Sequence, residues 1–408
     1  MSGWRHQAPV HSPLSAAALL AGARAAVSRN GAPSQAEAQV AALLRERYSA
    51  RAVLLTESGT AALTAALLAV LKDRPGSPVA LPAYACYDLA TAAEGAGAPV
   101  LLYDLDPHTL APDLSQIDAA LRQGAAAIVV VHFYGCPVDL GLVNRLAATT
   151  GGGGGGAVVI EDAAQAVGGT LHNRPAGSQS SLAVLSFGRG KGLTGGSGGA
   201  LLAHDAAGQR LLDRAQGLLG AARRGWPELL SITAQFLLER PSVYALPAAL
   251  PFLHLGETIY RTPRVLRRPT SASCPVVAAT WRLAEREVEV RRRNAERLLV
   301  ELRWQPGFEV ITTPPHARPG YLRLPVLASL AARRSAAEPA ARRLGVMGGY
   351  PKVLCDLERF SPRCLNRDGA FPGSRLLAAR LCTLPTHGQL RIRDFERLAL
   401  WIRAVGGR

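Results

Sequence analysis

Residues 157–162 read Ala157-Val158-Val159-Ile160-Glu161-Asp162, and this stretch decides the fold that we expect. A continuous apolar run bounded by a glycine tract is typical of a strand that is buried on both faces of a parallel sheet. Asp162 is then expected just past the carboxyl end of the strand, where open α/β sheets place their ligand sites. Two roles for its carboxylate remain open at this point. It caps a helix, with Gln165 completing a capping-box-like pattern, or it contacts a ligand.

Outward from this strand, short apolar segments alternate with helical patterns between about residues 30 and 205. This alternation predicts an α/β fold with a mostly parallel sheet that helices cover on both faces. The six glycines at 151–156 precede a strand, whereas a dinucleotide-binding loop links a strand to a helix, so we interpret them as a flexible surface loop. The expected strands are 52–55, 78–81, 99–103, 127–131, 157–160, 182–185 and 199–203, and the expected helices are 60–72, 113–121 and 140–148.

The chain has 408 residues, which is too long for one ordinary core, so we expect two domains. A long helix is expected from Cys274 to about Leu302, with Ser273 as its N-cap and Pro275 in its first turn. After this helix, a strand-like segment at 321–326 and helical patterns near 331–344 and 392–405 predict a smaller α+β domain.

The composition excludes some classes of protein. A hydrophobic fraction of 48% with 19% charged residues is typical of a globular protein and argues against disorder. The net charge is +16, but the arginines are scattered and no nucleic-acid-binding module is present, so we expect no nucleic-acid partner. The basic surface would instead attract phosphate-bearing substrates.

The six cysteines contain no C-x-x-C pair, which favours reduced thiols in a cytoplasmic enzyme over a metal site or disulfides. Residues 14–20 are a short, alanine-rich apolar run, which favours an amphipathic helix over a cleaved signal peptide.

Lys191 is one of only three lysines in a chain with 46 lysine and arginine residues in total, the others being Lys72 and Lys352. It lies in a glycine-rich run, Ser186-Phe187-Gly188-Arg189-Gly190-Lys191-Gly192. A guanidinium group stays protonated and cannot form an imine, whereas a lysine amine can lose its proton and condense with an aldehyde. Lys191 is therefore either a solvated loop residue or a nucleophile that carries a carbonyl cofactor.

Several motifs share their order and spacing with the DegT/DnrJ/StrS-type aminotransferases, and the chain resembles this family. They are TESGTAAL at 56–63, LPAY at 81–84, VHFYG at 131–135, EDAAQA at 161–166, Ser186-Phe187 with Lys191 five residues after the serine, and GGA at 198–200. The motifs DGAFPG at 368–373 and LPTH at 384–387 fit more loosely. The resemblance covers about residues 10–215 well and about residues 275–405 less closely.

The resemblance implies a fold-type-I enzyme that depends on pyridoxal 5'-phosphate. It implies that Lys191 holds this cofactor as a Schiff base and then moves a proton as general base and acid. It also implies that Asp162 pairs with the ring nitrogen and keeps the cofactor an electron sink. In this interpretation, Lys191 and Asp162 are the catalytic residues.

The resemblance assigns the other cofactor contacts as well. Gly59 and Thr60 open a helix directly after a strand, and free amides at a helix N-terminus suit a phosphate group. Ser186 matches a family serine that contacts the same phosphate, and Gln165 matches a residue near the phenolic oxygen of the cofactor. The family usually stacks an aromatic ring on the cofactor at the position of Cys86, and here the nearby rings are those of Tyr84 and Tyr87.

We therefore expect a large cofactor domain with an N-terminal helical segment at 1–258 and a smaller domain at 259–408. The implied function is transfer of an amino group from an amino acid, with glutamate the expected donor, to a keto acceptor such as a nucleotide-linked keto-sugar. The family implies a homodimer. His132 and His387 are candidates for contacting the acceptor, although single histidines are more often structural.

Residues 226–258 form an unexpected apolar segment, interrupted by Pro247 and Pro251. No run in it is long enough to span a bilayer. It therefore forms a dimer or domain contact, or else it contacts a membrane surface peripherally. The family's asparagine-containing loop has no clear counterpart at 260–263, which leaves the acceptor open. The alternative functions are another fold-type-I reaction and a non-catalytic membrane-surface protein on the same fold.

Overall fold

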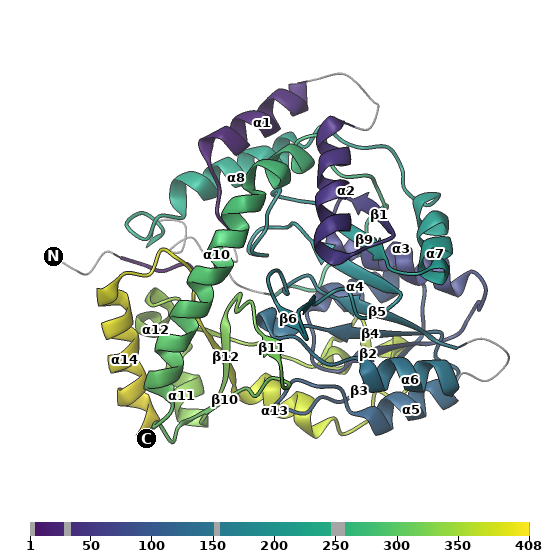
Figure 1. Cartoon of the computed structure of the whole chain (residues 1–408). Helices are drawn as coiled ribbons and strands as arrows, with labels where there is room; N and C mark the ends of the chain where they lie inside the picture. The colour runs from purple at the N-terminus through teal and green to yellow at the C-terminus, as the bar shows by residue number, and fades with distance from the viewer. Residues whose placement is uncertain (1–4, 28–33, 151–155, 246–257, 408) are drawn as a thin grey trace.

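The computed structural model describes residues 5–27, 34–150, 156–245 and 258–407. A seven-stranded sheet in the order β1-β9-β8-β5-β4-β2-β3 lies at its centre (Figure 1). β9 runs antiparallel to both of its neighbours, and the other neighbouring pairs are parallel, which confirms a mostly parallel α/β sheet. The strands are β1 (Ala52–Thr56), β2 (Val79–Pro82), β3 (Val100–Tyr103), β4 (Ala127–Val131), β5 (Val158–Asp162), β8 (Leu182–Ser186) and β9 (Gly199–Ala203).

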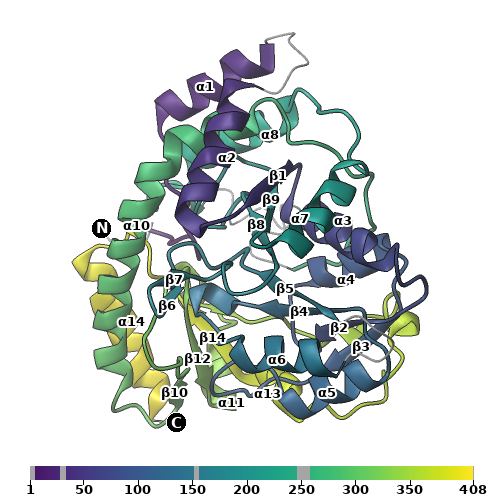
Figure 2. The same ribbon diagram turned by 45° about the vertical axis from the view of Figure 1, so that its right-hand side comes forward.

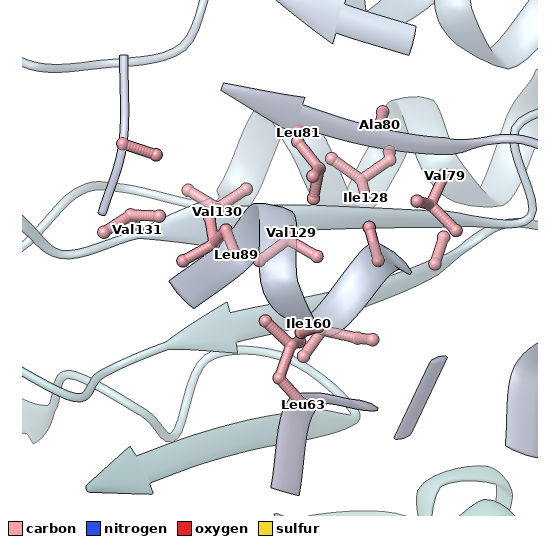
Figure 3. Packing of buried hydrophobic residues seen from close by; sticks show 14 of the residues in the cluster. Leu63, Val79, Ala80, Leu81, Leu89, Ile128, Val129, Val130, Val131 and Ile160 are labelled. Carbon is pink, nitrogen blue, oxygen red and sulfur yellow. The ribbon is translucent and has the colours of Figure 1, made fainter. Parts of the chain in front are cut away.

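Helices cover both faces of this sheet because successive side chains of each strand point to opposite sides. Leu54 of β1 packs into the core on the side of α3 (Gly59–Leu71), whereas Leu55 packs on the side of α2 (Gln35–Tyr48) and α10 (Ser273–Leu302). Figure 3 shows the first core from close by, with side chains of α3, α4, β2, β4 and β5. The remaining helices around the sheet are α4 (Tyr87–Gly95), α5 (Leu114–Arg122), α6 (Gly141–Thr149) and α7 (Ala206–Gln216).

The C-terminal part of the chain builds a second sheet in the order β10-β12-β14-β13. Figures 1 and 2 show α14 alongside α10, and their apolar side chains share one core with this sheet. Residues 349–371 return to the large sheet, where the Leu354 amide donates to the Ala83 carbonyl at 2.8 Å. The division at residue 258 stays a prediction. The elements are β10 (Phe308–Val310), β12 (Leu324–Ala328), β13 (Met347–Gly348), β14 (Leu381–Leu384), α11 (Leu330–Ser335), α12 (Pro339–Arg343), α13 (Pro372–Arg380) and α14 (Ile392–Gly406).

Three local expectations need correction. The long helix α10 begins at Ser273, so this serine is not the N-cap, and its hydroxyl donates to the Ser197 carbonyl at 2.7 Å. The helical pattern at 331–344 is split into α11 and α12 because Pro339 carries no N–H group for a continuous helix. β5 ends two residues later than expected, so Asp162 is its last residue instead of lying past its end, and no helix follows it.

The N-terminal segment ties distant parts of the chain together. α1 (Ala16–Val27) packs on α10 and on α8 (Trp226–Leu238). Before α1, the His6 amide donates to the Pro241 carbonyl at 2.8 Å, and the His11 imidazole contacts the buried carboxylate of Glu239. The Gln7 amide donates to the Arg343 carbonyl at 2.8 Å. Residues 5–12 thus connect the segment after α8 with the smaller sheet.

Two predicted features lie partly outside the described residues. They are the glycine loop, of which residues 151–155 are not described, and the apolar segment 226–258, of which residues 246–257 are not described. Within the described ranges, no helix is both long and apolar enough to cross a membrane.

Candidate active site

One cavity at the carboxyl edge of the large sheet collects all seven residues that the sequence suggests for the site. It measures about 480 Å³ including its open mouth. β5 and β8 are parallel neighbours that both end at this edge, and α3 starts beside them, so residues far apart in sequence meet here. The lining residues are Gly59, Thr60, Leu63, Cys86, Asp88, Leu89, Val131, Asp162, Ala164, Gln165, Val184, Ser186, Lys191 and Tyr350.

The start of α3 offers hydrogen-bond donors at one end of the cavity. Ser58 is the N-cap, and its hydroxyl accepts from the Ala61 amide at 3.0 Å. The Thr60 amide has no hydrogen-bond partner among the described residues, as is usual for the first turn of a helix, whereas the backbone beside Gly59 pairs with Gly198. The Ser186 hydroxyl lies beside Gly59, 3.2 Å from where a β-carbon on Gly59 would be. This end of the cavity therefore suits an anion such as a phosphate.

Asp162 supplies a buried carboxylate on the floor of the cavity, with 7% of its surface exposed. One of its oxygens accepts from the Ala164 amide at 3.0 Å, within a turn and not at a helix start. The helix-cap hypothesis for Asp162 is therefore wrong. Burial raises the pKa of Asp162, while the Ala164 hydrogen bond and the charge of Lys191 lower it. A cationic group beside this carboxylate would favour its charged form.

Lys191 reaches the cavity from the loop between β8 and β9. Gly190 and Gly192 flank it with φ angles of 74° and 82°, a left-handed conformation that favours glycine. A β-carbon at position 192 would also lie 2.8 Å from a guanidinium nitrogen of the buried Arg291. The two glycines thus let the chain turn sharply on either side of the lysine.

Cys86 lies at the N-cap position of α4, and its thiol lies 3.7 Å from a carboxylate oxygen of Asp88. Burial raises the pKa of Cys86 to about 12, so the thiol is neutral at physiological pH. Tyr84 and Tyr87 do not line the cavity. Sequence reasoning missed Asp88, which lies two residues after Cys86 in the same motif region.

Tyr350 also lines the cavity and was missed, because it comes from a segment with no distinctive pattern. The Gln165 amide nitrogen donates to its hydroxyl at 2.8 Å, and the Gln165 oxygen accepts from the Tyr134 amide at 3.0 Å. The Tyr350 amide in turn donates to the Tyr84 hydroxyl at 3.0 Å, and the hydroxyls of Tyr84 and Tyr134 lie 3.3 Å apart. These four residues form a hydrogen-bonded ring that joins the segments after β2, β4, β5 and β13.

The two histidine candidates are both engaged in structural contacts. His132 is fully buried, its Nδ1 accepts from the Val138 amide at 3.0 Å, and its Nε2 lies 3.0 Å from Glu161. The Nε2 of His387 lies 2.8 Å from the Ala8 carbonyl. Neither histidine is among the residues that line the cavity.

Comparison with known proteins gives matches of two kinds. Residues 26–227 match the DegT/DnrJ/EryC1/StrS aminotransferase family. The chain is 32% identical over 192 residues to an L-glutamine:2-deoxy-scyllo-inosose aminotransferase of Micromonospora echinospora, covering 47% of this chain and 44% of that protein. It is 36% identical over 172 residues to a GDP-perosamine synthase of Caulobacter vibrioides, covering 41% and 44%. The matched region thus spans less than half the length of these relatives.

The fold is also that of a solved structure. The crystal structure of AtS13 from Actinomadura melliaura superposes with a TM-score of 0.77, covering 98% of this chain and 99% of that one at 23% identity. This likeness extends over both sheets, which the family match does not.

Proposed function

We propose, on the premise that residues 26–227 belong to the DegT/DnrJ/EryC1/StrS aminotransferase family, that this chain is a pyridoxal-phosphate-dependent aminotransferase. It would move an amino group from an amino acid, glutamate first among them, to the keto group of a nucleotide-linked sugar. The observation that carries the proposal is the shared cavity, because Lys191, Asp162 and the first turn of α3 all line it.

The described residues fit pyridoxal phosphate in three respects. The amides of Gly59 and Thr60, with the Ser186 hydroxyl, match the needs of a phosphate group. The buried Asp162 carboxylate matches a protonated ring nitrogen, and Lys191 supplies an amine in the same cavity. Cys86 is the one residue that departs from the family pattern. The family usually has an aromatic side chain here, which would stack on the cofactor ring, and Cys86 supplies none.

Each residue then has a defined task. When bound, pyridoxal phosphate supplies an electron sink that stabilises negative charge on the α-carbon of an amino acid. Asp162 would hold a proton on the ring nitrogen. The Nζ atom of Lys191 would take a proton from the α-carbon of the donor and deliver it to the C4′ carbon of the cofactor. The first turn of α3 would fix the phosphate and so orient the ring.

We also propose that the working form is a cytoplasmic homodimer. The six cysteines are free, which suits a reducing compartment. Trp226, Leu230 and Leu237 of α8 are exposed and offer an apolar face that a second copy could cover. One of the relatives is named for a GDP-linked sugar and the other for an inosose, which supports a sugar-like ketone as the acceptor, with a nucleotide-linked keto-sugar as the first candidate.

Mapping the covalently attached cofactor tests this function. The purified protein is loaded with pyridoxal phosphate, reduced with borohydride, digested and analysed by mass spectrometry. We expect the label on the peptide that contains Lys191 and none in a Lys191→Ala variant. A label confined to Lys72 or Lys352 would contradict the assignment.

Incubation with glutamate or glutamine then separates an aminotransferase from other enzymes of this cofactor. We expect conversion of the cofactor to pyridoxamine phosphate with release of the matching 2-oxo acid. Turnover of an amino acid without pyridoxamine phosphate would indicate a different reaction on the same fold.

A further inference from the structure

The buried guanidinium group of Arg291 packs against the loop that carries Lys191. Arg291 lies on α10 and is fully buried. A β-carbon at Gly192, the residue directly after Lys191, would lie 2.8 Å from its Nη1 atom and 3.5 Å from its Nη2 atom. Both terminal nitrogens therefore rest against the Gly192 backbone, and a side chain at position 192 would displace them.

This loop depends on α10 for its support. Six of the eleven residues 188–198 are glycines, so few side chains can fix the course of the loop. Leu193 packs in one core with side chains of α10, and the Thr280 hydroxyl of that helix donates to the Thr194 carbonyl at 3.4 Å. Arg291 adds a contact further along the same helix, and this contact lies next to the lysine.

The N-terminal segment also holds the guanidinium group, because its Nη2 donates to the His11 carbonyl at 2.8 Å. Its Nε and Nη1 have no hydrogen-bond partner in the part of the chain that the structure describes. Burial lowers the pKa of Arg291 to about 10, although the charge of Glu287 raises it, so the group stays protonated. The Glu287 carboxylate itself accepts from the Gly388 amide at 2.7 Å. A buried cation with unused donors is costly compared with an apolar side chain of similar size, which indicates that the guanidinium group has a task at this loop.

We propose that Arg291 is a positioning residue, which fixes the Gly192 backbone and so holds the Lys191 amine where it can bond to the cofactor. This inference rests on the function proposed above, because the place of this amine matters only if it carries the cofactor and moves protons. Arg291 is not among the residues that line the cavity, so it acts through the loop. A displacement of about 1 Å can slow a reaction about 100-fold, so a support one residue away from Lys191 should affect its reactions.

Attachment of the cofactor to Lys191 tests the proposal without requiring turnover. Pyridoxal phosphate is added to the apoprotein, attachment is followed by absorbance, and borohydride fixes the product so that mass spectrometry identifies the lysine. The variants are Arg291→Met, which loses the planar group, and Arg291→Lys, which keeps a donor for the His11 carbonyl. The control is Arg293→Met, because Arg293 is exposed on the same helix. Urea unfolding checks that each variant is folded.

A second measurement separates positioning of the lysine from a general structural role. Titration calorimetry gives the affinity for pyridoxal phosphate of the wild type, Arg291→Met, Lys191→Ala and the double variant. Arg291→Met should weaken binding while Lys191 is present. It should have little effect in the Lys191→Ala background, because the amine through which Arg291 acts is then missing.

We expect Arg291→Met and Arg291→Lys to slow attachment by about tenfold or more, and Arg293→Met to behave like the wild type. Wild-type attachment rates in the folded Arg291 variants would overturn the proposal. So would full recovery of the rate in Arg291→Lys, since the contact with His11 alone would then suffice. An equal loss of affinity with and without Lys191 would also overturn it, because that loss would be purely structural. A wild type that attaches no cofactor to Lys191 would instead refute the proposed function, and this inference with it.

Discussion

A β-carbon on Gly59 would lie 2.8 Å from the β-carbon of Ser186, so the first turn of α3 rests directly on the end of β8. Real β-carbons do not approach so closely, and the carbonyl of Leu185 closes the same space at 3.3 Å. Only glycine lets the helix start near enough for its amides and the Ser186 hydroxyl to face one ligand. The close approach therefore links the fold of this edge to its anion-binding chemistry.

Gly59→Ala should destabilise the protein by about 1–3 kcal/mol, the usual range for overpacking a core, and should weaken binding of pyridoxal phosphate. Gly217→Ala is the matched control, because Gly217 has a helical conformation and its β-carbon would meet only the Arg214 carbonyl at 3.4 Å. It should leave stability equal or slightly raised. Urea unfolding measures both, and equal stabilities of the two variants would contradict this packing argument.

Asp162→Asn should leave the protein folded, because the amide oxygen of asparagine can still accept from the Ala164 amide. It should nevertheless slow the reaction of cofactor-loaded protein with glutamate by several orders of magnitude, since the negative charge next to the ring nitrogen is lost. Stopped-flow absorbance gives the rate. A rate within about threefold of wild type, under about 1 kcal/mol in barrier, would show that the charge of Asp162 is not used.

Cys86→Phe should tighten binding of pyridoxal phosphate, because it restores an aromatic ring at the position where the family stacks one on the cofactor. The expected gain is about 0.5–1.5 kcal/mol, roughly twofold to tenfold in Kd. Cys86→Ala is the control and should change the affinity little, since the thiol is neutral and its hydrogen-bond partner among the described residues is Asp88. Fluorescence titration of the apoprotein measures the affinity. Weaker binding of pyridoxal phosphate by Cys86→Phe would show that the side chain at position 86 does not stack on the cofactor ring.

His387 should make the protein sensitive to acid. Burial lowers its pKa to about 4, whereas the ordinary value is near 6.5. Between these pH values the unfolded chain binds a proton that the folded chain does not, so stability falls as the pH drops from about 6.5 to about 4. The loss reaches about 3 kcal/mol for this one group. His387→Gln keeps a donor for the Ala8 carbonyl but does not titrate, so its stability should vary less over this range. Parallel curves for the two proteins in pH-dependent urea unfolding would refute the assignment.

The sequence predicted the large sheet well because its strands are short, apolar and bounded by turn residues. All seven expected strands are present within two residues of their predicted limits. The antiparallel direction of β9 was not predicted, since strand direction depends on how the chain connects and not on local pattern. α4 was missed because it is short and six of its nine residues are buried, so it has little polar face to reveal its period.

The residues of the candidate site also fall into two groups, those that the sequence predicted and those that only the structure revealed. Asp162, Ser186 and Lys191 stand next to buried strands or within motifs, so they were visible in the sequence, although their roles stay predictions. Tyr350 comes from the chain around the second sheet, more than 150 residues after Lys191, and only the fold brings it to the cavity. The sequence pattern at Asp162 suited a helix cap equally well, and only the turn after β5 decides against that role.

The contact between His11 and Glu239 limits how this protein can be rebuilt from parts. Glu239 is buried directly after α8, and the chain beside it is held by the hydrogen bond from His6 to Pro241. An engineer who grafts the α8 segment onto a relative, or deletes it to shorten the chain, must therefore exchange residues 5–12 at the same time. A chimaera that carries only one of the two segments would lose this contact and leave Glu239 with Gln235, or His11 with Gln389, as its remaining hydrogen-bond partner. The two segments thus form a single structural unit, although more than 200 residues separate them in the chain.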